Sequence, residues 1–201
     1  SPGLMKLITE SGLEQFIYRS TDHPGLIDEL LEHQTVSSVS FIEHLPDDHG
    51  LELVIVGEDI AYKTGPMFAP NWFDEFFFSR LARVVEAYHR KGIKVLFHSD
   101  GNLNEVLGGL VEAGINGLNP IETLAGMDIR NIHSRFPDLF MVGGIDVSQL
   151  LPFGTPDDIR RAVRKAIEDA EGKIMIGSST ELNNDVPLEN YLALREAVLE
   201  S

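Results

Sequence analysis

One pattern recurs along the chain from residue 51 onward: a short apolar run rich in β-branched residues, a polar turn, then an amphipathic helix. Such runs are too apolar to leave one face in water, so they predict parallel strands covered by helices. The recurrence therefore predicts an α/β fold of consecutive β/α units joined by right-handed crossovers. The predicted strands are Leu51–Val56, Ile93–Phe97, Ile115–Leu118, Leu139–Val142 and Lys173–Ile176.

Two architectures accommodate these units: an open doubly wound sheet, or five consecutive units of an eight-unit TIM barrel, (β/α)8. In both, residues 1–50 form N-terminal helices and residues 51–201 form the five units of a single domain. A partial barrel has two open sheet edges, which are normally protected. We expect the N-terminal helices, another copy or partner chain, or parts of a longer parent protein to cover them. The start Ser1-Pro2-Gly3, without Met, suggests a processed chain or an internal fragment.

Several helix boundaries have recognisable signals. Thr155–Asp158 predicts a helix start, because the segment combines a capping hydroxyl, a proline and two acidic side chains near the positive end of the helix dipole. Asn71 and Asn102 are predicted to cap two further helices. The first of these is predicted to continue past Tyr88 and to end at Gly92.

Charge and composition exclude several classes of function. The chain has 32 acidic and 16 basic residues, a formal net charge of −16, and no basic patch, which argues against binding to nucleic acid or to anionic membranes. It has no cysteine, so disulfides and thiolate ligands or nucleophiles are impossible. No apolar run approaches the roughly 18 residues that span a bilayer, and no signal peptide is recognisable. A cytoplasmic protein is expected.

Polar side chains follow every predicted strand, where the active site of a parallel α/β fold lies. His98 and Asp100 are the most informative pair, because residues two apart on a strand share a face and can act as metal ligands or as an acid–base pair. The alternative is that these residues cap helices or form turns. The full set is Glu58, Asp59, His98, Asp100, Asn119, Glu122, Asp146, Ser178, Ser179 and Glu181.

Six segments, in order along most of the chain, carry a resemblance to a known family. They are Gly57–Ile60, Thr64–Pro70, Gly92–Asn102, Glu112–Glu122, Gly143–Asp146 and Pro187–Asn190. With these segments the sequence resembles the uroporphyrinogen decarboxylase superfamily, especially its cobamide-dependent methyltransferase-like branch. The resemblance implies a (β/α)8 barrel, of which this chain corresponds to the C-terminal part, and we therefore predict the barrel over the doubly wound sheet.

The resemblance also implies a metal site, with departures. Methyltransferases of this branch typically hold zinc through a His-x-Cys pair and a further Cys. Here His98 matches, Asp100 stands at the first Cys, and Ser178 or Ser179 stands at the second, so zinc bound by thiolates is excluded. A divalent metal held by His98, Asp100 and Glu181 through nitrogen and oxygen is the remaining prediction.

The other predicted roles follow from the same positions. Glu181 is a third ligand or an acid–base group, and Asp146 and Glu58 orient the substrate as part of the catalytic set. The residues predicted to bind substrate are Asp59, Asn119, Glu122, Ser178 and Ser179. One cavity at the carboxyl end of the sheet is predicted to be faced by His98, Asp100, Asp146 and Glu181, with Glu58 and Asp59 across its opening.

The leading functional prediction is methyl transfer between a small methylated substrate and a thiol or a corrinoid carrier, with a metal as Lewis acid and a corrinoid protein as partner. The first alternative is decarboxylation of uroporphyrinogen without a metal, in tetrapyrrole biosynthesis. That reaction needs cationic groups around an acidic substrate, and Lys63 is the only basic residue near a predicted strand end. The second alternative is a noncatalytic fragment or binding module.

Overall fold

The computed structural model describes residues 1–201. The chain forms two compact units. Unit 1 comprises Ser1–Ile60, Pro66–His98 and Glu105–Asn116, and unit 2 comprises Ala61–Gly65, Ser99–Asn104 and Gly117–Ser201. The prediction of one barrel domain over residues 1–201 stays a prediction.

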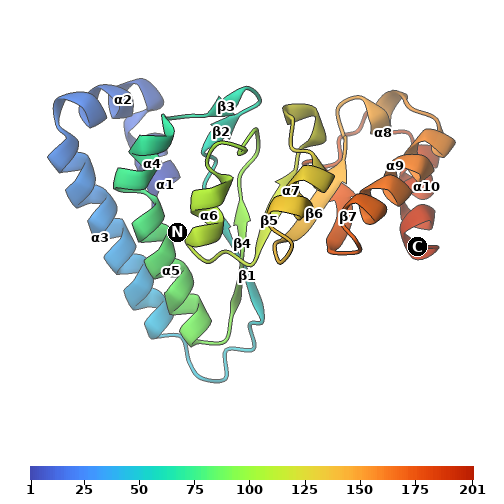
Figure 1. Ribbon diagram of the computed structural model, residues 1–201. Helices are drawn as coiled ribbons and strands as arrows, with labels where there is room; N and C mark the ends of the chain where they lie inside the picture. The colour runs from blue at the N-terminus through green and yellow to red at the C-terminus, as the bar shows by residue number, and fades with distance from the viewer. The chain divides into compact units, whose positions relative to one another are not determined.

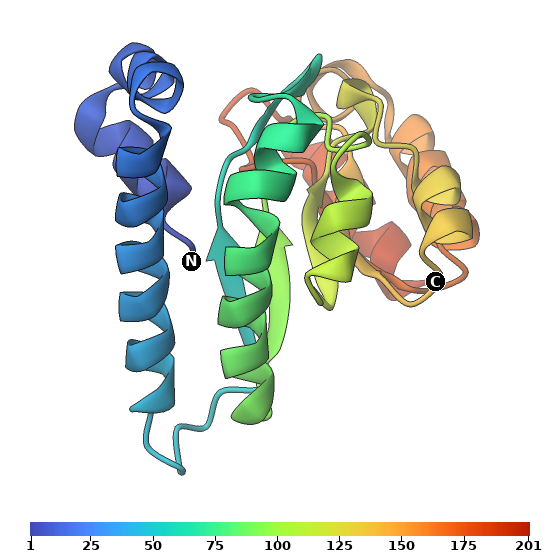
Figure 2. The ribbon, with the colours of Figure 1, turned by 60° about the vertical axis from the view of Figure 1, so that its left-hand side comes forward.

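Unit 1 contains the N-terminal helices and the first two long strands. Strands β1 and β4 pair in parallel, with Leu53 opposite Lys94 and Gly57 opposite His98. Helices α3 and α5 lie side by side in both views of the chain (Figures 1 and 2). The elements are α1 (Leu4–Ser11), α2 (Leu13–Asp22), α3 (Pro24–Glu43), β1 (Leu53–Gly57), α4 (Pro70–Phe76), α5 (Phe78–Arg90), β4 (Lys94–His98) and α6 (Leu107–Glu112).

Unit 2 contains three further parallel strands. In its sheet β5 pairs with β6, and β6 pairs with β7, from Met141 opposite Ile174 to Ile145 opposite Ser178. Helices α9 and α10 pack on each other. The elements are β5 (Gly117–Ile121), η1 (Thr123–Ala125), α7 (Ile129–Arg135), β6 (Phe140–Ile145), α8 (Leu150–Phe153), α9 (Pro156–Asp169), β7 (Ile174–Ser178) and α10 (Leu188–Leu199). Two short strands, β2 (Ala61–Tyr62) and β3 (Gly65–Pro66), pair separately.

The strand order distinguishes the two architectures left open by the sequence. It runs β1-β4-β5-β6-β7, so each strand of this sheet pairs with the sheet strand that precedes it in the sequence. A doubly wound sheet reverses direction at an internal switch point, whereas a barrel adds its strands consecutively. The fold is therefore of the TIM-barrel type, with five consecutive β/α units, as predicted.

The helix start at Thr155 is confirmed in detail. The Thr155 hydroxyl accepts a hydrogen bond from the Asp158 N–H at 3.2 Å, and the Thr155 N–H donates to the Asp158 carboxylate at 2.9 Å. This reciprocal capping box satisfies backbone groups that a helix N-terminus leaves without partners. Pro156 then occupies the first turn, where its missing N–H costs nothing.

The two predicted asparagine caps are wrong. Helix α4 begins at Pro70, with Ala69 in extended conformation as its N-cap, because proline fits the first helical position and places Asn71 inside the helix. Helix α6 begins only at Leu107, and the Asn102 side chain instead accepts a hydrogen bond from the Asn104 N–H at 3.1 Å. Asparagine serves turns and caps equally well, so its presence alone did not distinguish them.

The predicted helix from Asn71 past Tyr88 is two helices that meet at Phe77. Phe77 has φ −119°, outside the helical range, and separates α4 from α5. Phe76 and Phe77 are buried on either side of this break, while Phe78 is half-buried.

The outer strand of each unit exposes apolar side chains. On β1 of unit 1, Leu53 and Ile55 are 44% and 62% exposed, and on β7 of unit 2, Met175 is 54% exposed. Apolar side chains on sheet edges are usually covered by another element. The predicted cover by a partner chain or a second copy stays a prediction. None of the helices combines the length and the apolar character needed to cross a membrane.

A buried arginine joins the helices of unit 1. The Arg80 side chain is only 8% exposed; its Nη2 donates to Asp28 Oδ1 at 2.7 Å, and its Nη1 donates to the Phe76 carbonyl at 2.9 Å. Arg80 thus ties α5 to α3 and to the end of α4. The neighbouring Arg83 pairs with Glu32 at 2.8 Å, but its side chain is 43% exposed.

We expect Arg80→Ala to lower the free energy of unfolding by about 2–3 kcal/mol, because it leaves the buried Phe76 carbonyl without its donor and removes the packed aliphatic part of the arginine side chain. Arg83→Ala is the matched control, with an expected loss below about 1 kcal/mol, since exposed ion pairs contribute little. Urea unfolding followed by circular dichroism measures both values. Equal losses for the two variants would contradict this account of Arg80.

Candidate functional site

His98 is the last residue of β4 and lies at the carboxyl end of the unit 1 strands. The Glu58 N–H donates to the His98 carbonyl at 3.0 Å, which continues the β1–β4 pairing beyond Gly57. The imidazole Nε2 lies 3.8 Å from Asp59 Oδ1, with side-chain exposures of 35% and 52%. This distance is too long for a hydrogen bond and suits a weak ion pair when the imidazole is protonated. His98 and Asp59, which are predicted to lie across the opening of one cavity, are therefore close together.

Glu58 has a structural role. Its side chain is buried, and its two carboxylate oxygens accept hydrogen bonds from the N–H groups of Gly3 and Met5, each at 2.7 Å. These amides belong to the start of α1, where a negative charge is favourable. Glu58 therefore anchors α1 to the end of β1. Its predicted role in orienting a substrate stays a prediction.

Asp146 follows β6 and is also engaged by the backbone. One oxygen accepts from the Ser148 N–H and hydroxyl, and the other accepts from the N–H groups of Gln149 and Leu150, both at 2.7 Å. Burial alone would raise the pKa of Asp146, but these hydrogen bonds outweigh it and hold the pKa below its ordinary value. The geometry is that of the turn-forming alternative, and the predicted catalytic role stays a prediction.

The segment that links β4 to α6 carries Asp100 and is held by its neighbours in unit 2. Its Ser99 N–H donates to the Asn119 carbonyl at 3.1 Å, and its Gly101 N–H donates to Glu122 Oε2 at 2.6 Å. Asn119 and Glu122 were both predicted to bind substrate. In the structure they contact this segment, Asn119 through its main chain and Glu122 through its side chain. Substrate binding by either residue stays a prediction.

The residues after β7 contact the end of β6. The Ser179 N–H donates to the Ile145 carbonyl at 2.8 Å, and the buried Ser179 hydroxyl accepts from the Val147 N–H at 3.3 Å. The Ser178 hydroxyl donates to the Thr180 carbonyl. Glu181 is exposed and accepts from the Thr180 hydroxyl at 2.8 Å. Asp146 and the Ser178–Glu181 segment thus follow neighbouring strands of the same sheet, as predicted.

The predicted metal ligands divide between the two units. His98 belongs to unit 1, and Asp100 and Glu181 belong to unit 2. Neither unit by itself holds a group of three or more His, Asp or Glu side chains placed to bind a metal ion, and thiolate ligands are impossible without cysteine. A zinc centre with thiolate ligands is therefore excluded, and a divalent metal held by His98, Asp100 and Glu181 stays a prediction.

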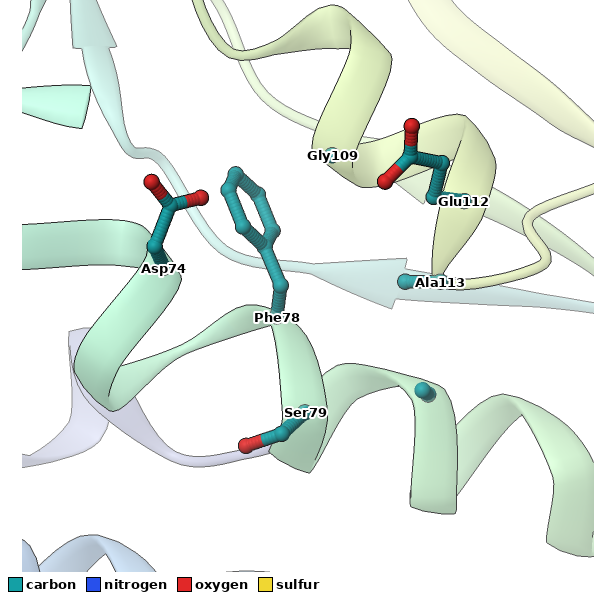
Figure 3. Close-up of a pocket in the computed structure, with 7 residues that line it drawn as sticks. Asp74, Phe78, Ser79, Gly109, Glu112 and Ala113 are labelled. Atoms are coloured by element: carbon teal, nitrogen blue, oxygen red, sulfur yellow. The ribbon is translucent and has the colours of Figure 1, made fainter. Parts of the chain in front are cut away.

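A separate pocket of unit 1 lies between α4, α5 and α6 and has a volume of about 270 Å³. Figure 3 shows the Phe78 ring beside Gly109, with Asp74 on one side and Glu112 on the other. A Cβ at position 109 would lie 2.3 Å from the Phe78 ring, so a larger residue there would require the ring to shift. None of the predicted site residues lines this pocket.

Two features outside the predicted site residues fix the Asp100 segment: a contact with Tyr62 and the conformation of Gly101. The Tyr62 carbonyl accepts from the Asn102 N–H at 2.9 Å, and Gly101 adopts a positive φ of 90°. A Gly between Asp and Asn is a turn signal that predicts such a conformation. No sequence signal identifies a main-chain carbonyl as a partner, because every residue has one.

Comparisons with known proteins agree with this fold. Residues 4–201 match the family described as Uroporphyrinogen decarboxylase (URO-D). Two relatives are named methylcobamide:CoM methyltransferase MtbA. The one from Methanosarcina mazei is 20% identical over 77% of this chain and 42% of its own length. The one from Methanosarcina acetivorans is 18% identical over 76% of this chain and 43% of its own length. A solved methyltransferase from Methanosarcina mazei matches with a TM-score of 0.74 and 21% identity, over 94% of this chain and 53% of its own. The chain spans about half the length of these proteins.

We expect Asp146→Asn to lower the stability most at neutral pH. A carboxyl whose pKa is lowered by folding stabilises the native state above its unfolded pKa, and this contribution disappears as the pH falls below about 4. The difference in free energy of unfolding between wild type and variant should therefore shrink between pH 5 and pH 2–3, roughly the range in which a paired carboxylate becomes protonated. Urea titrations at each pH measure it. Asp138→Asn, at an exposed carboxyl, is the control and should change stability little. A difference that grows toward acid would contradict the argument.

Proposed function

The chain belongs to the uroporphyrinogen decarboxylase family, and we propose that it is a methyltransferase. In this proposal it moves a methyl group between a small methylated substrate and a thiol or corrinoid carrier. The names of the two relatives and their cobamide substrate support this choice. The observation that carries it is His98 at the end of β4 with the Asp59 carboxylate 3.8 Å away. A corrinoid protein is the proposed partner.

The pair His98 and Asp59 can supply acid–base chemistry to such a transfer. A thiol becomes a good nucleophile only as a thiolate, so it must lose its proton before or while the carbon–sulfur bond forms. We assign that proton to the His98 imidazole, and the Asp59 carboxylate stabilises the imidazolium that results. The methyl group leaves the carrier without its bonding electron pair and forms the new bond to sulfur, so the charges balance.

Two other functions are the alternatives to methyl transfer. The name of the matching family favours decarboxylation of uroporphyrinogen, which needs cationic groups for the substrate carboxylates. Lys63, between β2 and β3, is exposed, and no further basic residue was predicted near a strand end. The length of the chain relative to its relatives favours a binding module or a part of a larger enzyme.

We expect the purified protein to demethylate methylcobalamin in the presence of 2-mercaptoethanesulfonate, the thiol named in the relatives as CoM. His98→Ala should reduce the rate by about 100-fold or more, the usual contribution of a general base. The loss of methylcobalamin absorbance measures the rate. His33→Ala, at an exposed histidine of α3, is the matched control and should keep the wild-type rate.

Each contrary result points to one alternative. An unchanged rate in His98→Ala would refute the acid–base role. Consumption of uroporphyrinogen with release of CO₂, and no methyl transfer, would identify a decarboxylase. The absence of both reactions would favour the binding module.

The divalent-metal role of His98, Asp100 and Glu181 stays a separate proposal with its own test. Elemental analysis of the purified protein at neutral pH should show a stoichiometric metal that is lost in His98→Ala, because removing one of three ligands weakens binding strongly. The same His33→Ala variant is the control. A wild-type protein that is free of metal and does not bind added Zn²⁺ would overturn this proposal without affecting the acid–base assignment.

A further inference from the structure

The 99–104 loop, which joins β4 to α6, is fixed at three successive places by main-chain N–H groups of its own. Ser99 donates to the Asn119 carbonyl at 3.1 Å, Gly101 donates to Glu122 Oε2 at 2.6 Å, and Asn102 donates to the Tyr62 carbonyl at 2.9 Å. Only one of these acceptors is a side chain. Asp100 lies between the first two contacts, so its main chain is held on both sides.

Close packing leaves the loop little freedom on the side of the β2–β3 hairpin. Gly101 is buried with φ 90°, and a Cβ there would lie 2.7 Å from the Tyr62 carbonyl oxygen and 2.8 Å from that of Ala61. Contacts this short do not occur for real side chains, so the two backbones touch directly. The loop therefore cannot move toward the hairpin, and Glu122 holds it from the end of β5.

Glu122 is well suited to this task. It follows β5 directly, and its half-buried carboxylate makes a short, charge-assisted hydrogen bond, of the kind that is about twice as strong as a neutral one. The end of the loop is tied to the same region, because Asn104 Nδ2 donates to the Gly126 carbonyl at 3.0 Å. Glu122 thus contributes an acidic side chain to the contacts that fix the main chain around Asp100.

We propose that Glu122 is a positioning residue, which holds the 99–104 loop, and with it Asp100, in the geometry that methyl transfer requires. This inference rests on the proposed function and changes the role of Glu122 from substrate contact to loop support. A positioning residue acts through another group. Its loss should therefore lower kcat while the KM for methylcobalamin changes little.

The test compares Glu122→Ala with Glu122→Gln, whose amide oxygen can still accept the Gly101 N–H. Hydrogen exchange at the Gly101 amide, followed by NMR, should accelerate about 10- to 100-fold in the alanine variant and much less in the glutamine variant, as expected for the loss of a hydrogen bond to a charged group. In the methylcobalamin assay, kcat should fall about tenfold with alanine and recover with glutamine. Glu105→Ala removes an exposed carboxylate next to the loop and is the matched control.

Every other outcome decides against the proposal or against its premise. Unchanged exchange at Gly101 in Glu122→Ala would overturn the loop contact, and faster exchange with unchanged kcat would overturn its importance for the reaction. A higher KM with unchanged kcat would return Glu122 to substrate binding. If Glu122→Ala does not fold, Glu122→Asp, whose acceptor is one methylene shorter, replaces it. A wild-type protein without methyl transfer would refute the proposed function, while the exchange data would still decide whether Glu122 holds the loop.

Discussion

Parallel strand pairing is the constraint on which the rest of this structure depends. Main-chain hydrogen bonds continue past the last strand residue at three places: Glu58 donates to the His98 carbonyl, Ser99 to the Asn119 carbonyl, and Ser179 to the Ile145 carbonyl. Because a parallel register sets how far each strand extends relative to its neighbour, these bonds fix where the polar residues after each strand begin. The strand-end residues therefore lie at defined positions of the sheet instead of on freely moving turns.

Much of the fold could be predicted because its signals are local. The alternation of apolar runs and amphipathic helices predicted five consecutive β/α units, and the Thr155 capping box predicted one helix start to the residue. The prediction failed where several local choices competed. The Phe76–Phe78 run fits one helix by propensity, but the structure ends α4 at Phe76 and begins α5 at Phe78, a break that no propensity encodes.

The sequence predicts which polar residues follow the strands but not what they do. Carboxylates cap backbone amides and bind substrates with the same atoms, so the predicted site roles stay predictions. Glu58 and Asp146 both use their oxygens on main-chain N–H groups, which the sequence allowed but did not require. Whether His98 meets Asp59 or another acid depends on register and rotamers that differ by a few ångströms, below the resolution of any sequence pattern.

The same contacts explain how an acidic chain tolerates carboxylates at its strand ends. Like charges placed close together destabilise a fold unless cations or hydrogen-bond donors compensate for them. Here hydrogen bonds compensate, most of them from the backbone. Glu58 accepts two from N–H groups, and Asp146 accepts three from N–H groups and one from a hydroxyl. Glu122 accepts one from the Gly101 N–H. These carboxylates therefore do not need a bound cation to be stable. At the end of β4, the His98 imidazole has a carboxylate neighbour in Asp59, 3.8 Å away.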